Sequence, residues 1–301
     1  GLQPHTKRMR KARMRASTLA MVRHAQDHGY AVPAFNIVDE VSLRAVIEAA
    51  EVANSPVIIQ ASLKTARDLG VDLIGAMFDA AVRGRSVNAA LHLDHCPDIA
   101  WIEKVIAAGW SSVLFDASDR PFDKAVAETA QIVQSAHAVG VEVESEIENI
   151  VGVEDGVGSD VLVHSYTPEQ LVEAATSCGV DLLAPQLGTA HGRYAGRPTL
   201  LPERVRQFRR LTDKPVVLHG GTGLTQAEFR LLIAAGVSKI NISTDLKQTY
   251  MRAAYDFLKG ASERDEWDPP SMFRSVAGVV RAMATHYFEV FGSAGRTLPD
   301  A

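Results

Sequence analysis

Short apolar runs alternate with amphipathic helical patterns from residue 31 onward. The runs that predict β-strands span residues 31–37, 56–62, 88–95, 111–118, 141–148, 181–188, 215–220 and 239–244. Helical periodicity separates nearly all of them, for example from about residue 39 and over residues 121–139, 202–211 and 226–235. Eight consecutive strand–helix units with nearly continuous apolar strands predict an α/β fold, a (β/α)8 TIM barrel, with closing helices over residues 246–258 and 273–291. A doubly wound open sheet is the alternative, because periodicity alone does not show that a sheet closes.

Composition fits one barrel domain over residues 17–301. The chain has 301 residues, of which 47% are hydrophobic, so it can bury a large core. No apolar run approaches the roughly 20 residues that cross a bilayer, which predicts a soluble protein without a membrane partner. The only two cysteines, Cys96 and Cys178, favour the reducing cytoplasm over a disulfide-stapled secreted fold. A net charge of −5 gives no general reason to expect nucleic acid as a partner.

Residues 1–16 form a basic N-terminal tail. Its cationic side chains are Lys7, Arg8, Arg10, Lys11, Arg13 and Arg15. Such a run could bind an anionic surface, but basic termini are more often solvated and poorly ordered, and we expect the same here.

The strand predicted over residues 88–95 ends abruptly in Asp94-His95, and Pro97 closes it. In barrels, the C-terminal ends of the strands carry the chemistry. Adjacent strand residues point to opposite faces, so Asp94 and His95 can both face one site only if the strand already turns there. The alternative is structural, with Asp98 as the N-cap of a helix over residues 99–108 and His95 as a satisfied polar side chain.

Two further histidines follow predicted strands. His191 lies in Gly188-Thr189-Ala190-His191-Gly192, and His219 ends the seventh strand. In a closed barrel these two and His95 converge on one mouth, and three imidazoles with an open fourth position are typical of a catalytic zinc site. The sequence therefore predicts a zinc ion held by these three histidines.

The fifth predicted strand carries a glutamate at every other position: Glu142, Glu144, Glu146 and Glu148. Its other face is mostly apolar and is expected to pack on the helices, which turns the acidic face into the barrel. Clustered buried carboxylates need a neutralising cation or arginines, so we place Glu146 near the metal. A solvated edge strand is the alternative, but the fifth of eight barrel strands has no free edge.

A glycine loop, Gly220-Gly221-Thr222-Gly223, follows the seventh predicted strand, where barrel enzymes often hold phosphate. Asn241, Ser243 and Thr244 at the end of the eighth strand add candidate polar ligands. Between the fifth strand and the next helix, residues 149–160 form a long connection with three glycines, of the kind that is usually a lid or a disordered excursion. Glu154 is its candidate catalytic group.

Together these residues resemble the class II, zinc-dependent ketose-bisphosphate aldolases, which include fructose- and tagatose-1,6-bisphosphate aldolases. The resemblance runs from Tyr30 to Gly295, and its most specific parts are residues 91–95, 144–146, 152–156, 188–192, 219–223 and 239–245.

The resemblance implies a dimeric or tetrameric TIM barrel with zinc on His95, His191 and His219. It also implies that Glu146 binds the metal in an alternative position, and that Asp94 takes the proton from the C4 hydroxyl. Around the substrate phosphate and a monovalent cation (Na⁺ or K⁺) it implies Gly192, Gly220, Thr222, Asn241 and Thr244. Our candidate substrate-binding set also includes Gly221, Ser243, and Asn36 and Ser62 at the ends of the first two predicted strands.

Some positions depart from the family pattern. Glu148 replaces a common glycine, Cys96 sits where glycine is frequent, and Ser243 stands where some fructose-bisphosphate enzymes have aspartate. Pro270 replaces an arginine that many members use on the distal phosphate, often across a dimer interface, and Arg274 is the candidate substitute.

We therefore expect a lyase that cleaves a ketose 1,6-bisphosphate, preferably fructose 1,6-bisphosphate, to dihydroxyacetone phosphate and an aldehyde phosphate. Tagatose 1,6-bisphosphate and a deoxy-phosphogluconate are alternative substrates. Lys64, Lys214 and Lys239 could suggest a Schiff-base aldolase, but the histidine set argues against it. An alternative of another class is a non-catalytic phosphate-binding barrel that serves as a partner subunit, against which the intact Asp94 and Glu154 argue.

Overall fold

The structure, a computed structural model, describes residues 15–150, 152–154, 157–159, 164–192, 194 and 196–299; for residues 153, 154 and 157–159 it describes the backbone alone. Most of the basic tail lies outside this range. Arg15, near its end, forms an ion pair with Asp79 and donates hydrogen bonds to the carbonyls of Ala108 and Gly109.

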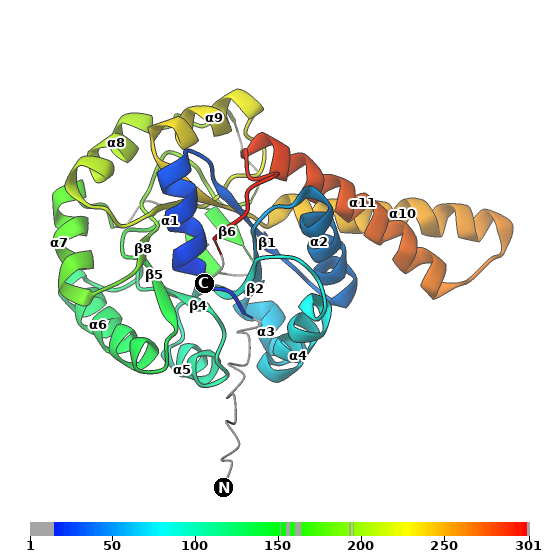
Figure 1. Cartoon of the computed structure of the whole chain (residues 1–301), viewed down its shortest axis with the longest axis horizontal. Coiled ribbons are helices and arrows are strands. Elements are labelled where there is room, and N and C mark those ends of the chain that lie inside the picture. The colour runs from blue at the N-terminus through cyan, green and yellow to red at the C-terminus, as the bar shows by residue number, and fades with distance from the viewer. Residues whose placement is uncertain are drawn as a thin grey trace, which may run out of the picture.

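Eight parallel strands close into one barrel (Figure 1). The barrel strands are β1 (Val32–Asn36), β2 (Val57–Ser62), β3 (Ala89–Cys96), β4 (Ser112–Asp116), β5 (Glu142–Glu146), β8 (Leu182–Leu183), β9 (Val216–Leu218) and β10 (Val237–Ile242). Their order is β1-β10-β9-β8-β5-β4-β3-β2, and the pairing of β1 with β10 closes the ring. This confirms the predicted TIM barrel over the open sheet. The short strands β6 (Gly152–Glu154) and β7 (Val157–Ser159) form a separate antiparallel pair.

The helices form a ring around the barrel, except for α1 (Thr18–His28), which lies over one end of it (Figure 1). The others are α2 (Glu40–Ala53), α3 (Leu63–Leu69), α4 (Val71–Val82), α5 (Ile99–Ala107), α6 (Phe122–Ala138), α7 (Pro168–Cys178), α8 (Pro202–Leu211), α9 (Gln226–Ala235), α10 (Thr244–Arg264) and α11 (Pro269–Val290). Capping boxes at Asp39, Thr167 and Thr225 start α2, α7 and α9, because each side chain satisfies a backbone N–H of the first turn. The α10–α11 hairpin projects away from the barrel (Figure 1). None of the helices in the described ranges is long and apolar enough to cross a membrane.

The predicted ends of the sixth and eighth strands are wrong. The run over residues 181–188 forms a strand only at Leu182–Leu183, and Pro185, which has no N–H to donate to a ladder, follows closely. The eighth strand ends at Ile242, and Thr244 already belongs to α10. Asp245 lies in the first turn of this helix, where its negative charge interacts favourably with the positive end of the helix dipole.

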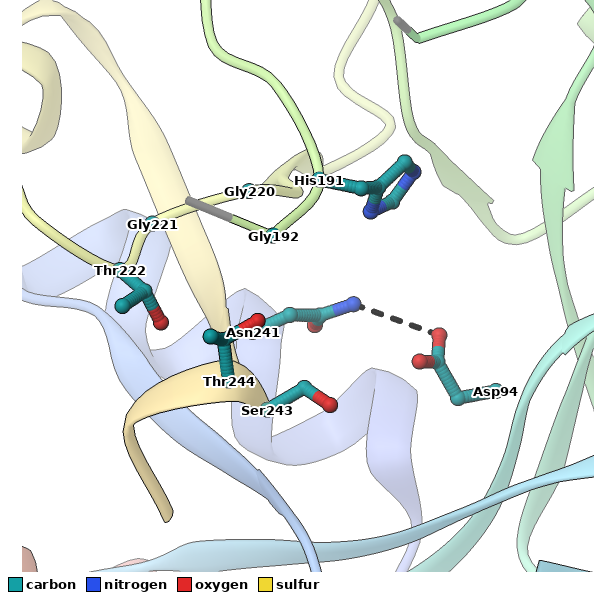
Figure 2. A pocket seen from close by; sticks show the side chains of 9 residues that line it. All are labelled: Asp94, His191, Gly192, Gly220, Gly221, Thr222, Asn241, Ser243 and Thr244. Atoms are coloured by element: carbon teal, nitrogen blue, oxygen red, sulfur yellow. Dashed lines mark hydrogen bonds between the residues drawn. The ribbon is translucent and has the colours of Figure 1, made fainter. Parts of the chain in front are cut away.

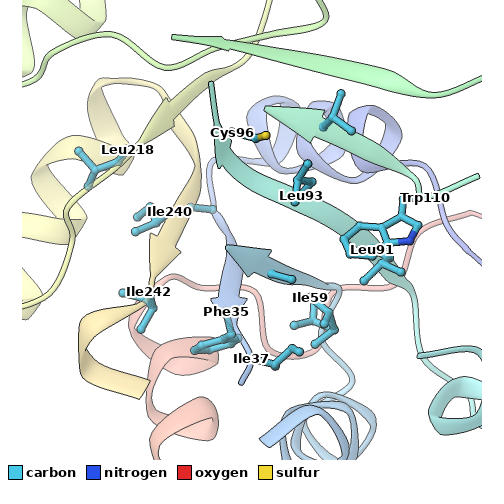
Figure 3. Close-up of a cluster of buried hydrophobic side chains, with 14 of the residues drawn as sticks. Phe35, Ile37, Ile59, Leu91, Leu93, Cys96, Trp110, Leu218, Ile240 and Ile242 are labelled. Carbon is cyan, nitrogen blue, oxygen red and sulfur yellow. The ribbon is translucent and has the colours of Figure 1, made fainter. Parts of the chain in front are cut away.

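Outward-facing strand residues build the main core. Phe35, Ile59, Leu91, Leu93 and Ile240 lie fully buried between the barrel and its helices (Figure 3). The alternate residues of the same strands face the barrel interior and are polar toward the C-terminal ends: Asn36, Gln60, His92, Asp94, Lys239 and Asn241 are all buried. A smaller apolar cluster that includes α1 residues fills the other end of the barrel. The alternation thus gathers the polar groups at the C-terminal mouth.

Candidate active site

The end of β3 turns where the Asp94-His95 pair requires it. His95 has a φ of +48°, and the pairing register with β4 shifts between Leu93 and Cys96, as in a β-bulge. Both side chains of the pair are therefore buried at the mouth instead of on opposite faces. Asp98 caps α5 by accepting from the N–H groups of Ala100 and Trp101, so its predicted structural role is confirmed alongside.

His95 lies among acidic groups. Its Nδ1 is 3.1 Å from Glu146 Oε2 and 3.2 Å from Asp116 Oδ2. Burial alone would lower the pKa of His95, but the two carboxylates outweigh it and raise the pKa to about 10. The surroundings of this imidazole favour positive charge.

The structure brings His95, Glu146 and His191 together. One ligand atom from each lies within 4.8 Å of the others, and all three side chains are buried. His219 lies beside this group, with its ring centroid 5.7 Å from that of His191 and its Nδ1 3.6 Å from Glu146 Oε2. The predicted histidines thus meet at one mouth, and Glu146 contacts this group as well.

The donor set fits a metal ion. His95 Nε2 and His219 Nδ1 are buried and have no hydrogen-bond partner among the described residues. Leaving such an atom unsatisfied costs about 1–3 kcal/mol, which a bound cation would remove. Imidazole and carboxylate ligands of this kind suit zinc. Nearby buried carboxylates, Asp94, Asp116 and Glu144, add negative potential at the same place.

Glu144 and Lys239 form a fully buried ion pair inside the barrel. Lys239 Nζ lies 2.8 Å from Glu144 Oε1 and 2.8 Å from Asn241 Oδ1. The other oxygen of Glu144 accepts a hydrogen bond from His219 Nε2 at 2.8 Å. This contact leaves Nδ1 as the ring nitrogen of His219 that can bind a metal ion. Lys239 is thereby held as a paired ammonium group, which does not suit a Schiff-base nucleophile.

The glutamates of the fifth strand do not all face the barrel. Glu144 and Glu146 do, and Glu142 lies at the other end of β5, where it accepts a hydrogen bond from Ser17. The strand ends at Glu146, and Glu148 pairs with Arg204 of α8 instead. The predicted four-carboxylate face is wrong at this last position because the alternation stops with the strand.

Asp116 is a site residue that the sequence analysis missed. It ends β4 and is buried against His95, and burial together with Glu146 raises its pKa. Like Asp94, it is a carboxylate at the C-terminal end of an apolar run, so the same signal would have found it.

A pocket is lined by the glycine loop, the His191 loop, the ends of β3 and β10 and the start of α10 (Figure 2). The lining residues are Asp94, His191, Gly192, Gly220, Gly221, Thr222, Asn241, Ser243 and Thr244. Gly220 has a φ of +70°, and a Cβ there would lie 2.1 Å from the carbonyl oxygen of Ala190, so only glycine lets these two loops approach. Thr189 Oγ1 donates to the carbonyl of His219 at 2.6 Å and joins the same loops.

The remaining candidates lie around this pocket or away from it. Asn36 donates a 3.0 Å hydrogen bond to Asp94, and Ser62 caps α3 through Thr65 N. Arg274 is 72% exposed on α11 and lines a groove between α2 and α11 instead of the pocket. The side chain of Glu154 lies outside the described residues; its backbone belongs to β6.

Comparison with known proteins identifies the family. The profile described as fructose-bisphosphate aldolase class-II matches residues 16–296. A probable fructose-bisphosphate aldolase from Bacillus subtilis (strain 168) is 34% identical over 283 residues, which cover 93% of this chain and 98% of that protein. A fructose-bisphosphate aldolase from Geobacillus stearothermophilus is 35% identical and covers 92% and 96%.

Solved structures agree with the fold. The YdjI aldolase from Escherichia coli K12 superimposes with a TM-score of 0.81 at 29% identity, covering 93% of this chain and 98% of that one. A putative fructose-1,6-bisphosphate aldolase from Coccidioides immitis gives 0.84 at 27% identity, with coverages of 92% and 96%. With the closed barrel and the histidine, carboxylate and glycine groups at its mouth, these matches show that the chain is a lyase of the class-II fructose-bisphosphate aldolase family.

Proposed function

We propose that this protein catalyses the zinc-dependent, reversible aldol cleavage of fructose 1,6-bisphosphate to dihydroxyacetone phosphate and glyceraldehyde 3-phosphate. The observation that carries the proposal is the buried group of His95, Glu146 and His191. It adjoins both the Asp94 carboxylate and the glycine loop, because His191 and Asp94 line the same pocket as Gly220 and Gly221.

Zinc would be held by His95 and His191 together with His219 or Glu146. When bound, the ion acts as a Lewis acid that polarises the substrate carbonyl and stabilises the negative charge that develops there. Neighbouring side chains hold the imidazoles in position, since Glu144 orients His219 and Asp116 lies against Nδ1 of His95.

Asp94 would accept the proton of the C4 hydroxyl as the carbon–carbon bond breaks. Burial pushes the pKa of Asp94 up, but His219, His95 and Lys239 and the hydrogen bond from Asn36 bring the net shift below its usual value. The carboxylate is therefore ionised and able to accept a proton. Asn36 at 3.0 Å and Asn241 at 3.4 Å fix its two oxygens.

The glycine loop and the start of α10 would bind the phosphate that stays with dihydroxyacetone. Backbone N–H groups near Gly220 and Gly221 and the positive end of the 21-residue helix α10 suit an anion. Thr222 is fixed by accepting a 3.1 Å hydrogen bond from Asp245 N, and Asn241, Ser243 and Thr244 supply polar side chains. A monovalent cation, Na⁺ or K⁺, beside the same phosphate is part of the proposal.

Glu154 would exchange a proton with the carbon of dihydroxyacetone phosphate next to its carbonyl. This assignment rests on its sequence position in the connection between β5 and α7, which begins and ends at the barrel mouth. Cleavage leaves negative charge on the carbon of dihydroxyacetone phosphate next to its carbonyl, and a group such as Glu154 is needed to protonate that carbon.

Steady-state cleavage of fructose 1,6-bisphosphate against tagatose 1,6-bisphosphate tests the substrate. We expect a kcat/KM ratio of about 10-fold or more in favour of fructose, because the two sugars differ only at C4, where Asp94 acts. The metal-stripped protein and its zinc-restored form serve as paired controls. A reversed ratio would assign tagatose 1,6-bisphosphate, and cleavage of a deoxy-phosphogluconate alone would overturn the bisphosphate assignment.

We also propose that the chain acts as a homodimer or homotetramer. The α10–α11 hairpin projects from the barrel (Figure 1). Its exposed large apolar side chains are Met251, Tyr255, Leu258, Trp267, Phe273 and Val279. Exposed apolar groups gathered on one projection are typical of a protein–protein contact. Light scattering of the purified protein is expected to give a mass of two or four chains, and a monomer at working concentration would contradict this.

Arg274 lies on this hairpin, so we propose that it binds the distal phosphate of the substrate in the active site of a neighbouring subunit. A guanidinium pairs with phosphate bidentately, and its loss is expected to cost about 2–3 kcal/mol in kcat/KM on the bisphosphate. Arg274→Ala should spare a substrate that lacks the distal phosphate. Arg264→Ala is the matched control, since Arg264 is an exposed arginine paired with Glu266 on the same hairpin. Equal loss on both substrates would point to a structural role.

A further inference from the structure

Glu148 and Arg204 form a buried ion pair outside the catalytic group. Glu148 follows the end of β5 and its side chain is 1% exposed, while Arg204 comes from the first turn of α8 and is 15% exposed. The contact is bidentate: Nη1 of Arg204 donates to Oε1 of Glu148, and Nη2 donates to Oε2 at 3.0 Å. Nothing in the proposed chemistry uses this pair.

The pair is bonded to the peptide groups of two further segments. Glu148 accepts from Gln186 N at 2.7 Å and from Tyr166 N at 3.1 Å. Arg204 donates to the carbonyl oxygens of the same two residues, each at 2.6 Å. The backbone N–H and C=O groups of both Tyr166 and Gln186 are therefore hydrogen-bonded to this one ion pair. Burying two charges is costly unless their polar atoms are satisfied, and here four backbone hydrogen bonds satisfy them.

These bonds join the ends of two functional segments. Glu148 and Tyr166 bracket the connection that contains Glu154, and hydrogen bonds between Asn149 and His164 join the same two ends. Gln186 begins the segment that leads to His191, and its Oε1 accepts from Gly188 N at 2.8 Å. The ion pair thus lies where both segments leave the barrel.

The two segments also touch near the site. A Cβ on Gly152 would lie 2.4 Å from the carbonyl oxygen of His191 and 2.8 Å from its N, so the backbone at the start of β6 lies directly against the backbone of His191. The two segments are therefore in direct backbone contact at this point.

We propose that Glu148 and Arg204 are positioning residues, which hold the segments of Glu154 and His191 in the relative position that the reaction needs. The inference deepens the proposed function and rests on its roles for these two residues. Because the resemblance to the family implies a common glycine at position 148, the pair would be a device of this chain and close relatives that share both residues.

The pair should affect catalysis more than substrate binding. The pocket residues Gly220, Gly221, Thr222, Ser243 and Thr244 come from other elements and make none of the contacts of the ion pair. A misplacement of about 1 Å in a catalytic group can cost about 100-fold in rate. Since Gly192 of the same pocket lies on the His191 segment, we expect KM to change slightly and kcat to fall much more when the pair is weakened.

Arg204→Lys in the full-length, zinc-loaded protein carries the test, because lysine keeps the charge but loses the forked donor geometry. We expect kcat to fall about 10-fold or more, KM to stay within about 2-fold, and zinc affinity measured against a competing chelator to fall about 10-fold. Amide hydrogen exchange should accelerate in peptides that cover residues 164–166 and 186–188. Arg204→Leu leaves the Glu148 carboxylate buried and uncompensated, a change that can unfold the chain, so it serves only as a second, stronger variant.

Arg210→Lys is the matched control, since Arg210 lies on the same helix in an exposed ion pair with Glu203, and it should match the wild type in every measurement. Wild-type kcat, zinc affinity and amide exchange in Arg204→Lys would overturn the inference. Uniformly faster exchange over the whole barrel would also overturn it, because the pair would then only stabilise the fold. Failure of the proposed function is distinguishable, because the wild type itself would then neither bind zinc nor cleave the bisphosphate.

Discussion

Asp94→Asn is expected to lose cleavage of fructose 1,6-bisphosphate by about 100-fold or more while still exchanging solvent deuterium into dihydroxyacetone phosphate. Cleavage needs a base for the C4 hydroxyl, and general acid–base groups contribute about 10²–10⁴-fold. Exchange does not involve C4, so with the proposed roles it needs the metal and Glu154 but not Asp94. The asparagine keeps the shape of the side chain and a carbonyl oxygen for the hydrogen bond from Asn36, which lies at 3.0 Å from Asp94.

Glu154→Gln should show the other pattern, with loss of both exchange and cleavage while dihydroxyacetone phosphate still binds. Exchange is followed by the proton NMR signal of dihydroxyacetone phosphate in deuterium oxide, and cleavage by a coupled assay. Asp98→Asn is the matched control, since Asp98 is close in sequence and asparagine caps a helix as well as aspartate does. If Glu154→Gln exchanges normally and Asp94→Asn does not, the two roles are reversed. If neither variant is impaired, the mouth of the barrel is not the active site.

Removal of zinc should abolish cleavage. We expect about one zinc per chain, reversible inactivation by a strong chelator, and loss of most of the metal in His95→Ala, His191→Ala and His219→Ala. Each histidine would supply one nitrogen ligand when zinc takes the place of a proton, and a three-imidazole set with an open position is the common catalytic arrangement for this ion. Metal content is measured by mass spectrometry after gel filtration. His137→Ala is the control, because His137 lies outside the site in a contact with Asp181 and should retain full zinc.

The same measurement distinguishes the ligand sets. The group whose ligand atoms lie within 4.8 Å of one another consists of His95, Glu146 and His191 and does not include His219. If Glu146→Gln loses as much zinc as His219→Ala, both side chains take part in holding the ion. Full zinc in all three alanine variants would show that the ligand set is wrong. Activity that survives metal removal, with borohydride trapping of substrate on a lysine, would show a Schiff-base enzyme instead.

Local pattern determined most of the architecture and much of the site. Apolar runs alternate with helices that begin at capping residues such as Thr225, and the helix predicted over residues 226–235 is α9 as observed. The sequence also placed Asp94, His191 and Gly220 at strand ends, and these three residues line one pocket. These features can be predicted from the sequence because each depends on residues only a few positions away in the chain.

Tertiary structure decided what depends on residues far apart in the chain. The pairing of Val32 with Lys239 closes the barrel. The hydrophobic periodicity of the sequence does not show which distant strands pair. The bulge at His95 is a shift in the pairing register between β3 and β4. Asp116 at the end of β4 lies against the same histidine. Glu148 reads as a fourth member of an alternating strand, yet its charge is paired by Arg204, 56 positions away. A buried charge needs a partner wherever the fold can supply one, and the sequence alone does not show which distant side chain that will be.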